Sequence, residues 1–168
     1  MLEKWLEDAK AAHPASWVSL PELELYMDQV ITLMNRHHDV VSAPADRPLT
    51  SSMINNYVKD KVIPAPVKKK YTREHLTALS IMCMLKAEFT LPEIRELMTG
   101  LAKTYSTEEL YAAFADAQTA CMQDAAAAVE ARQHDDKAEK YLLAMSLALE
   151  ANAKRIAAAR LLESLKEE

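Results

Sequence analysis

The polar side chains best suited to bind a ligand are concentrated in one stretch of the chain, residues 51–73. The beginning of this stretch is rich in serine and asparagine. An asparagine can pair with adenine through two hydrogen bonds, and a serine can contact bases or phosphates. The end of the stretch is rich in lysine, which binds phosphate oxygens and so positions a protein on DNA. These residue types predict contact with double-stranded DNA through Ser51, Ser52, Asn55, Asn56, Lys59, Lys68, Lys69, Lys70, Tyr71 and Arg73.

The charge of the chain is distributed unevenly. The whole sequence carries a formal net charge of −5, which by itself argues against nucleic acid as a partner. Residues 47–75, however, hold 7 basic and 2 acidic side chains. A basic segment in an acidic chain is the local electrostatic footprint expected of a DNA contact. A solvated protein surface is the alternative explanation for the same charges.

Other kinds of chemistry find little support in the sequence. A single glycine, Gly100, excludes a dinucleotide-binding fingerprint and a phosphate-binding loop, because both need several glycines. Cys83 and Cys121 lie far apart and match neither a disulfide framework nor a metal motif. His37 and His38 would point about 100° apart on a helix, so they are not expected to share an ion. We therefore expect no catalytic residues, no metal site and no cofactor.

The periodicity of the apolar residues predicts an all-α protein. Residues 62–70 contain two prolines that disfavour a helix, and we expect them to form an extended, minimal β-wing. The segment 73–87 is apolar on nearly every side and should form a central, buried helix. Helices are expected at 2–12, 20–38, 51–61, 73–87, 91–99, 107–133 and 137–166, with a loop at 39–49 and a polar turn at His134-Asp135-Asp136.

Hydroxyl side chains mark where several helices should begin. Ser19, Thr90 and Ser106 are each followed three residues later by a glutamate. In this capping-box pattern the two side chains satisfy free backbone N–H groups at the start of a helix. Thr50 and Thr72 are expected to begin two further helices. Gly100 is expected to end the helix at 91–99, because glycine readily takes the left-handed conformation that follows many helices.

Residues 50–99 resemble the DNA-binding domain of MerR-type transcription regulators. The matching positions cover the family's recognition helix, its wing and the block that follows the wing. They are Ile54, Tyr57, Ile63, Pro64, Lys69 and Tyr71, followed by Phe89-Thr90-Leu91-Pro92-Glu93-Ile94-Arg95. The phrase LTSSMINNYVKDKVI…KKYTREH is more narrowly similar to a small family of MerR-like proteins from low-GC Gram-positive bacteria.

The resemblance implies a winged helix-turn-helix over residues 19–105. An N-terminal arm at 1–18 would precede it, and a C-terminal helical region at 106–168 would follow. The implied function is sequence-specific DNA binding that regulates transcription. Asn55 and Asn56 stand where the family has Arg and Tyr, so the family's DNA contacts there do not transfer unchanged. A helical protein–protein interaction module without DNA binding is the alternative.

The last long helix carries apolar residues at heptad spacing, Leu142, Met145, Leu149 and Ile156. This spacing favours helix pairing, so we expect these residues to form the interface of a homodimer. A bundle that binds a small-molecule effector and a docking surface for another protein are the alternatives.

The sequence also bears on where the protein acts. Its N-terminus lacks the basic and apolar regions of a signal peptide. No run of 18 apolar residues is present, so no segment should span a membrane. We therefore expect a cytoplasmic protein.

Overall fold

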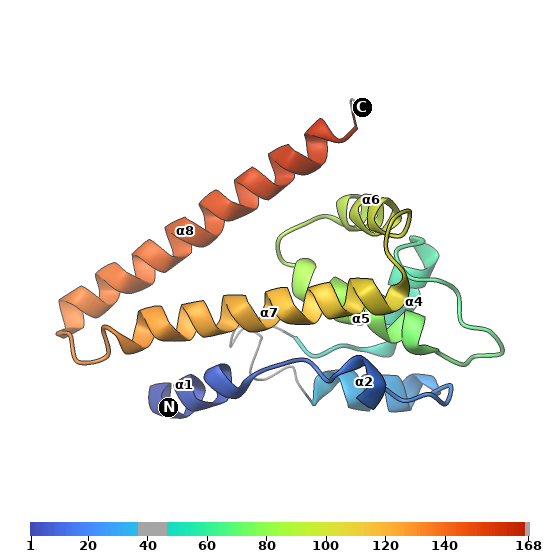
Figure 1. Ribbon diagram of the computed structural model, residues 1–168, viewed down its shortest axis with the longest axis horizontal. Helices are drawn as coiled ribbons and strands as arrows, with labels where there is room; N and C mark the ends of the chain where they lie inside the picture. Colours follow the sequence, from blue (N-terminus) through green and yellow to red (C-terminus); the bar gives the residue numbers. More distant parts are fainter. Residues whose placement is uncertain (37–46, 167–168) are drawn as a thin grey trace.

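The computed structural model describes residues 1–36 and 47–166, and all regular structure within them is helical (Figure 1). The elements are α1 (Leu2–Ala11), the 3-10 helix η1 (Trp17–Ser19), α2 (Met27–Asn35), α4 (Ser51–Lys59), α5 (Arg73–Leu85), α6 (Leu91–Leu101), α7 (Thr107–Glu130) and α8 (Lys137–Ser164). The predicted all-α class is confirmed. None of these helices combines the length and apolar character needed to cross a membrane.

The predicted helix starts at Thr90 and Ser106 are confirmed. Both residues form capping boxes, in which Glu93 and Glu109 accept hydrogen bonds from the backbone and hydroxyl groups of the two cap residues. These hydrogen bonds lower the pKa of Glu93 and Glu109 below the ordinary glutamate value. Thr50 and Thr72 are likewise the N-caps of α4 and α5.

The segment 20–38, predicted to be one helix, is the main correction. Within its described part, residues 20–36, only Met27–Asn35 forms an α-helix. The hydroxyl of Ser19 donates to the carbonyl of Ser16 rather than capping a helix. The backbone of Leu25 instead exchanges two hydrogen bonds with Tyr71, at 2.9 and 2.8 Å. This long-range pairing satisfies the backbone of Leu25 without a helix. Residues 37–46, which include His37, His38 and most of the predicted loop, lie outside the described residues.

The prediction that Gly100 ends its helix is also wrong. Gly100 lies inside α6, which continues to Leu101, and no glycine takes a positive φ. A Cβ at this position would meet no atom within 4 Å other than those of its chain neighbours and of the nearby backbone of its own helix. Neither a left-handed turn nor a close approach therefore requires glycine at this position.

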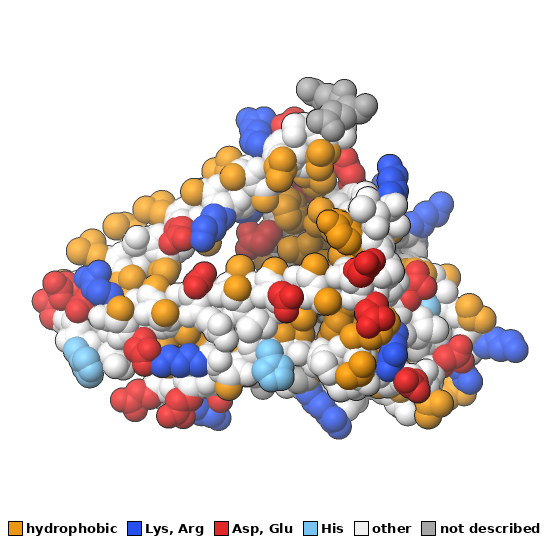
Figure 2. Space-filling view, viewed as in Figure 1, with side chains coloured by type: hydrophobic (Ala, Val, Ile, Leu, Met, Phe, Trp, Pro, Cys, Tyr) orange, Lys and Arg blue, Asp and Glu red, His pale blue; other side chains and the backbone are white. Residues whose placement is uncertain are grey.

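The long helix α7 packs against the N-terminal helix α1 and leads to the C-terminal helix α8. On one side it packs against α1, where Leu6, Ala9 and Ala126 form a small buried cluster. Near its start, the Tyr111 hydroxyl donates to the carbonyl of Ala15 at 2.8 Å. The helix α8 then turns back and diverges from α7 (Figure 1), and hydrophobic side chains lie exposed along it (Figure 2).

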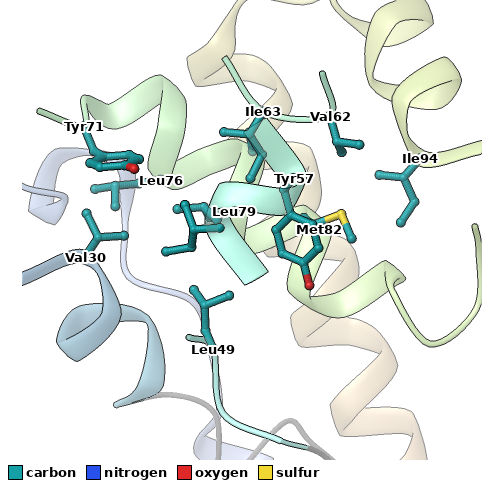
Figure 3. Packing of buried hydrophobic residues seen from close by; sticks show 12 residues of the cluster. Val30, Leu49, Tyr57, Val62, Ile63, Tyr71, Leu76, Leu79, Met82 and Ile94 are labelled. Atoms are coloured by element: carbon teal, nitrogen blue, oxygen red, sulfur yellow. The ribbon is translucent and has the colours of Figure 1, made fainter. Parts of the chain in front are cut away.

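The main hydrophobic core lies between α2, α4, α5 and α6 (Figure 3). The predicted central position of α5 is confirmed, because seven of its residues are buried. The other helices contribute fewer side chains, and the segments between them add several more. The buried residues are Val30, Leu49, Ile54, Tyr57, Val62, Ile63, Tyr71, Leu76, Ala78, Leu79, Met82 and Ile94. This core fixes the position of α4 and of the basic segment after it.

Candidate nucleic-acid interface

Helix α4 has one apolar side and one polar side. Thr50 begins it by accepting a hydrogen bond from the backbone N–H of Met53 at 3.3 Å. Ile54 and Tyr57 are buried in the core, and Met53 and Val58 pack against it. The polar side chains that were predicted to contact DNA, Ser51, Ser52, Asn55, Asn56 and Lys59, are all exposed. The core thus holds α4 in place while its polar side faces solvent.

A backbone turn directs the chain from α4 into the basic segment. Lys61 takes a φ of 56°, in the left-handed region that non-glycine residues rarely occupy. The N–H groups of Val62 and Ile63 both donate to the carbonyl of Tyr57, and their side chains are buried. The exposed side chain of Lys61 therefore lies on a rigidly anchored backbone.

The β-wing expected at residues 62–70 does not form as strands, and residues 67–70 make a tight turn. The N–H of Lys70 donates to the carbonyl of Val67 at 2.9 Å, and no strand forms in the part of the chain that the structure describes. Lys68 and Lys69, at the centre of this turn, have φ values of 50° and 65°. Two positive φ values are typical of a type I′ turn, which favours asparagine and glycine. We call residues 67–70 the lysine turn.

The lysine turn carries backbone strain. A non-glycine residue in a sparsely populated φ/ψ region costs roughly 1–3 kcal/mol, and such residues concentrate at functional sites. The side chains of Lys68 and Lys69 are both exposed, so a partner can reach them. The turn thus presents two cations on a strained backbone at positions where glycine or asparagine would fit more easily.

The base of the lysine turn is attached to the segment before α2. Lys70 lies 3.5 Å from the carboxylate of Glu24 and 6.0 Å from the ring centre of Tyr26. The paired backbones of Leu25 and Tyr71 lie directly beside these contacts. This attachment was not predicted, because residues 20–26 were expected to be part of a helix. Pro21 was the one residue that argued for a non-helical segment, but a proline fits the first turn of a helix equally well.

Two residues of the predicted DNA-binding set form contacts within the protein. Tyr71 is 2% exposed and packs edge-on against His75, and its burial raises the pKa of its hydroxyl. Its predicted DNA contact is therefore corrected, because the side chain belongs to the core. Arg73 donates two hydrogen bonds to the carbonyl of Leu20 and lies over the ring of Trp17. Its guanidinium thus links the start of α5 to residues 17–22, which we call the N-terminal segment.

The exposed members of the predicted set differ in how far they are engaged within the protein. The side chain of Lys70 has an acidic partner in Glu24, and those of Lys68 and Lys69 have no ion pair among the described residues. The candidate interface therefore consists of the polar side of α4 and the tip of the lysine turn. It comprises Ser51, Ser52, Asn55, Asn56, Lys59, Lys68 and Lys69.

The predicted dimer residues lie on α8 and are exposed. Leu142, Met145, Leu149 and Ile156 have 59, 55, 61 and 48% of their surface accessible. The carboxyl end of α8 contacts the rest of the molecule, where Leu162 is buried and Lys166 forms an ion pair with Glu96 at 3.0 Å. Most of α8 therefore presents an unpaired surface.

The described residues contain no disulfide and no cluster of metal-ligating side chains. Cys83 lies partly buried on α5, and burial raises the pKa of its thiol to about 11. Cys121 is exposed on α7, and neither cysteine forms a disulfide. Among residues 1–36 and 47–166, no three His, Cys, Asp or Glu side chains gather as metal ligands would.

Comparison with known proteins identifies one family. The model of a family described as Domain of unknown function (DUF1836) matches residues 15–114, and the chain belongs to this family. The matched residues include the core, α4 and the lysine turn, and exclude α8. No curated protein and no solved structure matches the chain.

Proposed function

We propose that this DUF1836 protein is a sequence-specific DNA-binding regulator of transcription that acts as a homodimer. The observation that carries the proposal is the two-sided character of α4, whose polar side chains are all exposed while its apolar side is buried. The resemblance of residues 50–99 to MerR-type regulators supports the same function. We further propose that the protein acts in the cytoplasm.

In the proposed complex α4 enters the major groove. Asn55 and Asn56 are suited to read base edges, because asparagine matches the donor and acceptor pattern of adenine. Lys59, Lys68 and Lys69 would bind phosphates, which adds affinity but little sequence preference. The lysine turn takes the role of the wing in this proposal, since its tip carries two exposed cations.

The exposed apolar stripe of α8, formed by Leu142, Met145, Leu149 and Ile156, supports a homodimer. A helix of 28 residues with four large apolar side chains about half exposed gains stability when a second apolar surface covers them. A second copy is the occupant we propose, because the heptad spacing of Leu142, Leu149 and Ile156 is self-complementary in a two-fold helix pair. Two copies of α4 related by this symmetry would favour a pseudo-palindromic DNA site.

Fluorescence anisotropy tests the proposal directly. The full chain is used to select duplexes from a random-sequence pool, and the selected duplex is then compared with a scrambled version. We expect the selected duplex to bind much more tightly. Its affinity should fall by roughly 10³–10⁵ between about 50 and 200 mM salt if about six to ten phosphates are contacted. Failure to bind any duplex at low salt, by a folded dimer, would contradict the proposal.

A helical protein-interaction module is the second candidate function. It is favoured by the exposed apolar residues of α8 and by the net charge of −5. The two functions separate in one measurement, because the interaction module would show no DNA binding at any salt concentration. A DNA-binding protein would lose affinity when Lys68 and Lys69 are neutralised.

A further inference from the structure

A groove lies between the end of α4, the start of α5, α6 and the start of α7, and it shares Lys59 with the polar side of α4. It has a volume of about 690 Å³, within the range typical of small-molecule sites. Its apolar lining comes from all four regions and includes Ile63, Ala78, Met98 and Leu110. This lining can accept a hydrocarbon or aromatic body.

The charged residues along this groove are mostly cations. Lys59 and Lys61 come from the end of α4, and Arg95 and Lys103 come from α6 and the turn after it. Glu74 is the single acid among the described residues that line the groove. Within residues 1–36 and 47–166, none of the four cations forms an ion pair. Arg95 does donate a hydrogen bond to the backbone carbonyl of Asp60, at 3.4 Å. The groove therefore combines apolar walls with an excess of cations that have no carboxylate partner.

A buried hydroxyl in the wall provides a second, independent observation. Thr77 is 1% exposed, and its Oγ1 has no hydrogen-bond partner. Leaving a buried polar group unpaired costs roughly 1–3 kcal/mol, and most such groups in folded proteins have a partner. Thr77 also lines the groove, so this unpaired hydroxyl belongs to a residue of its wall.

We propose that the groove binds an amphiphilic organic anion, a molecule with an apolar body and one acidic head group. The body packs against Ile63, Ala78 and Met98, and the head group pairs with the cations of α4 and α6. A nucleic-acid strand is a poorer occupant, because its repeated phosphates would have to lie against the apolar lining. The site is independent of DNA binding, although Lys59 belongs both to this groove and to the candidate nucleic-acid interface.

A matched pair of fluorescent probes tests the charge requirement. 1-Anilinonaphthalene-8-sulfonate carries an aromatic body and one sulfonate, and N-phenyl-1-naphthylamine has nearly the same body without the charge. We expect saturable binding of the anionic probe to the full chain and at least about tenfold weaker binding of the neutral probe, because the lost contacts are charge-assisted. Equal affinity for both probes would overturn the proposal.

Variants then locate the site. Arg95→Gln with Lys103→Gln should weaken the anionic probe about tenfold or more. Lys68→Gln with Lys69→Gln removes the same charge outside the groove and should leave its affinity within about twofold. Thr77→Val, which keeps the side-chain shape, should also weaken the anionic probe.

A substitution at an exposed position in the groove separates a loss of binding from a loss of folding. Ala102 lines the groove at the end of α6, so Ala102→Phe should abolish probe binding while the thermal unfolding midpoint stays near that of the parent protein. Undiminished probe binding in the folded Arg95/Lys103 and Ala102 variants would mean that the probe sits elsewhere, and would overturn the proposal.

Discussion

The guanidinium of Arg73 donates two hydrogen bonds to the carbonyl oxygen of Leu20, from Nε at 3.2 Å and from a terminal nitrogen at 2.8 Å. The same group lies 5.2 Å from the ring centre of Trp17 and 3.6 Å from the carboxylate of Glu22. Arg73 is the first residue of α5 and lies three residues after the end of the lysine turn. These contacts therefore hold the N-terminal segment against the base of the turn.

Replacing Arg73 should weaken this attachment. Arg73→Ala removes charge-assisted hydrogen bonds to a partly buried carbonyl, so we expect the free energy of unfolding to fall by about 1.5–3 kcal/mol. Urea denaturation measures the change. The matched control is Arg160→Ala, whose side chain is exposed on α8 and should matter by less than about 0.5 kcal/mol. Equal effects of the two substitutions would show that Arg73 does not anchor the segment.

The lysine turn allows stability and DNA affinity to be separated. Lys68→Asn with Lys69→Gly fits the two positive φ values, so we expect the free energy of unfolding to rise by about 1 kcal/mol. Lys68→Ala with Lys69→Ala keeps the strain and removes the same charge. Both double variants should lose DNA affinity to a similar extent. An Asn-Gly variant that is no more stable than the Ala-Ala variant would argue against strain in the turn.

Base reading and phosphate binding should give different patterns. Asn55→Ala is expected to relax the preference at one base pair, losing about 1–3 kcal/mol of discrimination there. Lys69→Ala should weaken binding to all duplexes alike and reduce the salt slope by about 1. Anisotropy with the selected duplex and its single-base variants distinguishes the two. If both substitutions behave alike on the selected and scrambled duplexes, the assigned roles are wrong.

Local chemistry explains which parts of the fold could be predicted from the sequence. Thr90 with Glu93, and Ser106 with Glu109, satisfy backbone groups within one helical turn, so the sequence near them decides where the helix begins. The apolar composition of α5 likewise predicts burial wherever its partners lie. The polar side of α4 follows from the spacing of Ile54 and Tyr57, which turns the residues between them toward solvent.

Long-range pairing explains what could not be predicted. Leu25 is extended because its backbone partner is Tyr71, which lies far along the chain, and no local signal identifies that partner. Tyr71 follows three lysines and so resembles a surface residue, yet the same pairing directs it into the core. The groove beside α6 was missed for a similar reason, because Lys61 and Lys103 are brought to it only by the tertiary fold.

Disrupting the exposed stripe of α8 should dissociate the proposed dimer. Leu149→Glu places a charge at the centre of the stripe, and its exposure means that the fold of a single chain should tolerate the change. Ala151→Glu is the control, because it adds the same charge about 200° around the helix. Sedimentation equilibrium should give one chain for Leu149→Glu and two for Ala151→Glu. Dimers of both variants would mean that the stripe is not the interface.

The thiol of Cys83 should respond to pH differently from an accessible cysteine. Its pKa is raised to about 11 because burial disfavours the thiolate, so at pH 8 the thiolate fraction is on the order of 10⁻³. In a Cys121→Ser background, alkylation of Cys83 should be slow and should accelerate about tenfold per pH unit between about pH 7 and 9, because the thiolate is the nucleophile. A rate that levels off near pH 9 would contradict the raised pKa.

The same raised pKa links the stability of the fold to pH. The folded chain retains the Cys83 proton to a higher pH than the unfolded chain, whose thiol has an ordinary pKa near 8.5. The stabilisation is therefore fully present below that ordinary pKa and is lost as the pH rises toward about 11. Urea denaturation should show a steeper loss of stability over this alkaline range for the parent chain than for Cys83→Ala, since alanine carries no proton to lose. Parallel pH profiles for the two proteins would show that the thiol is not protected by the fold.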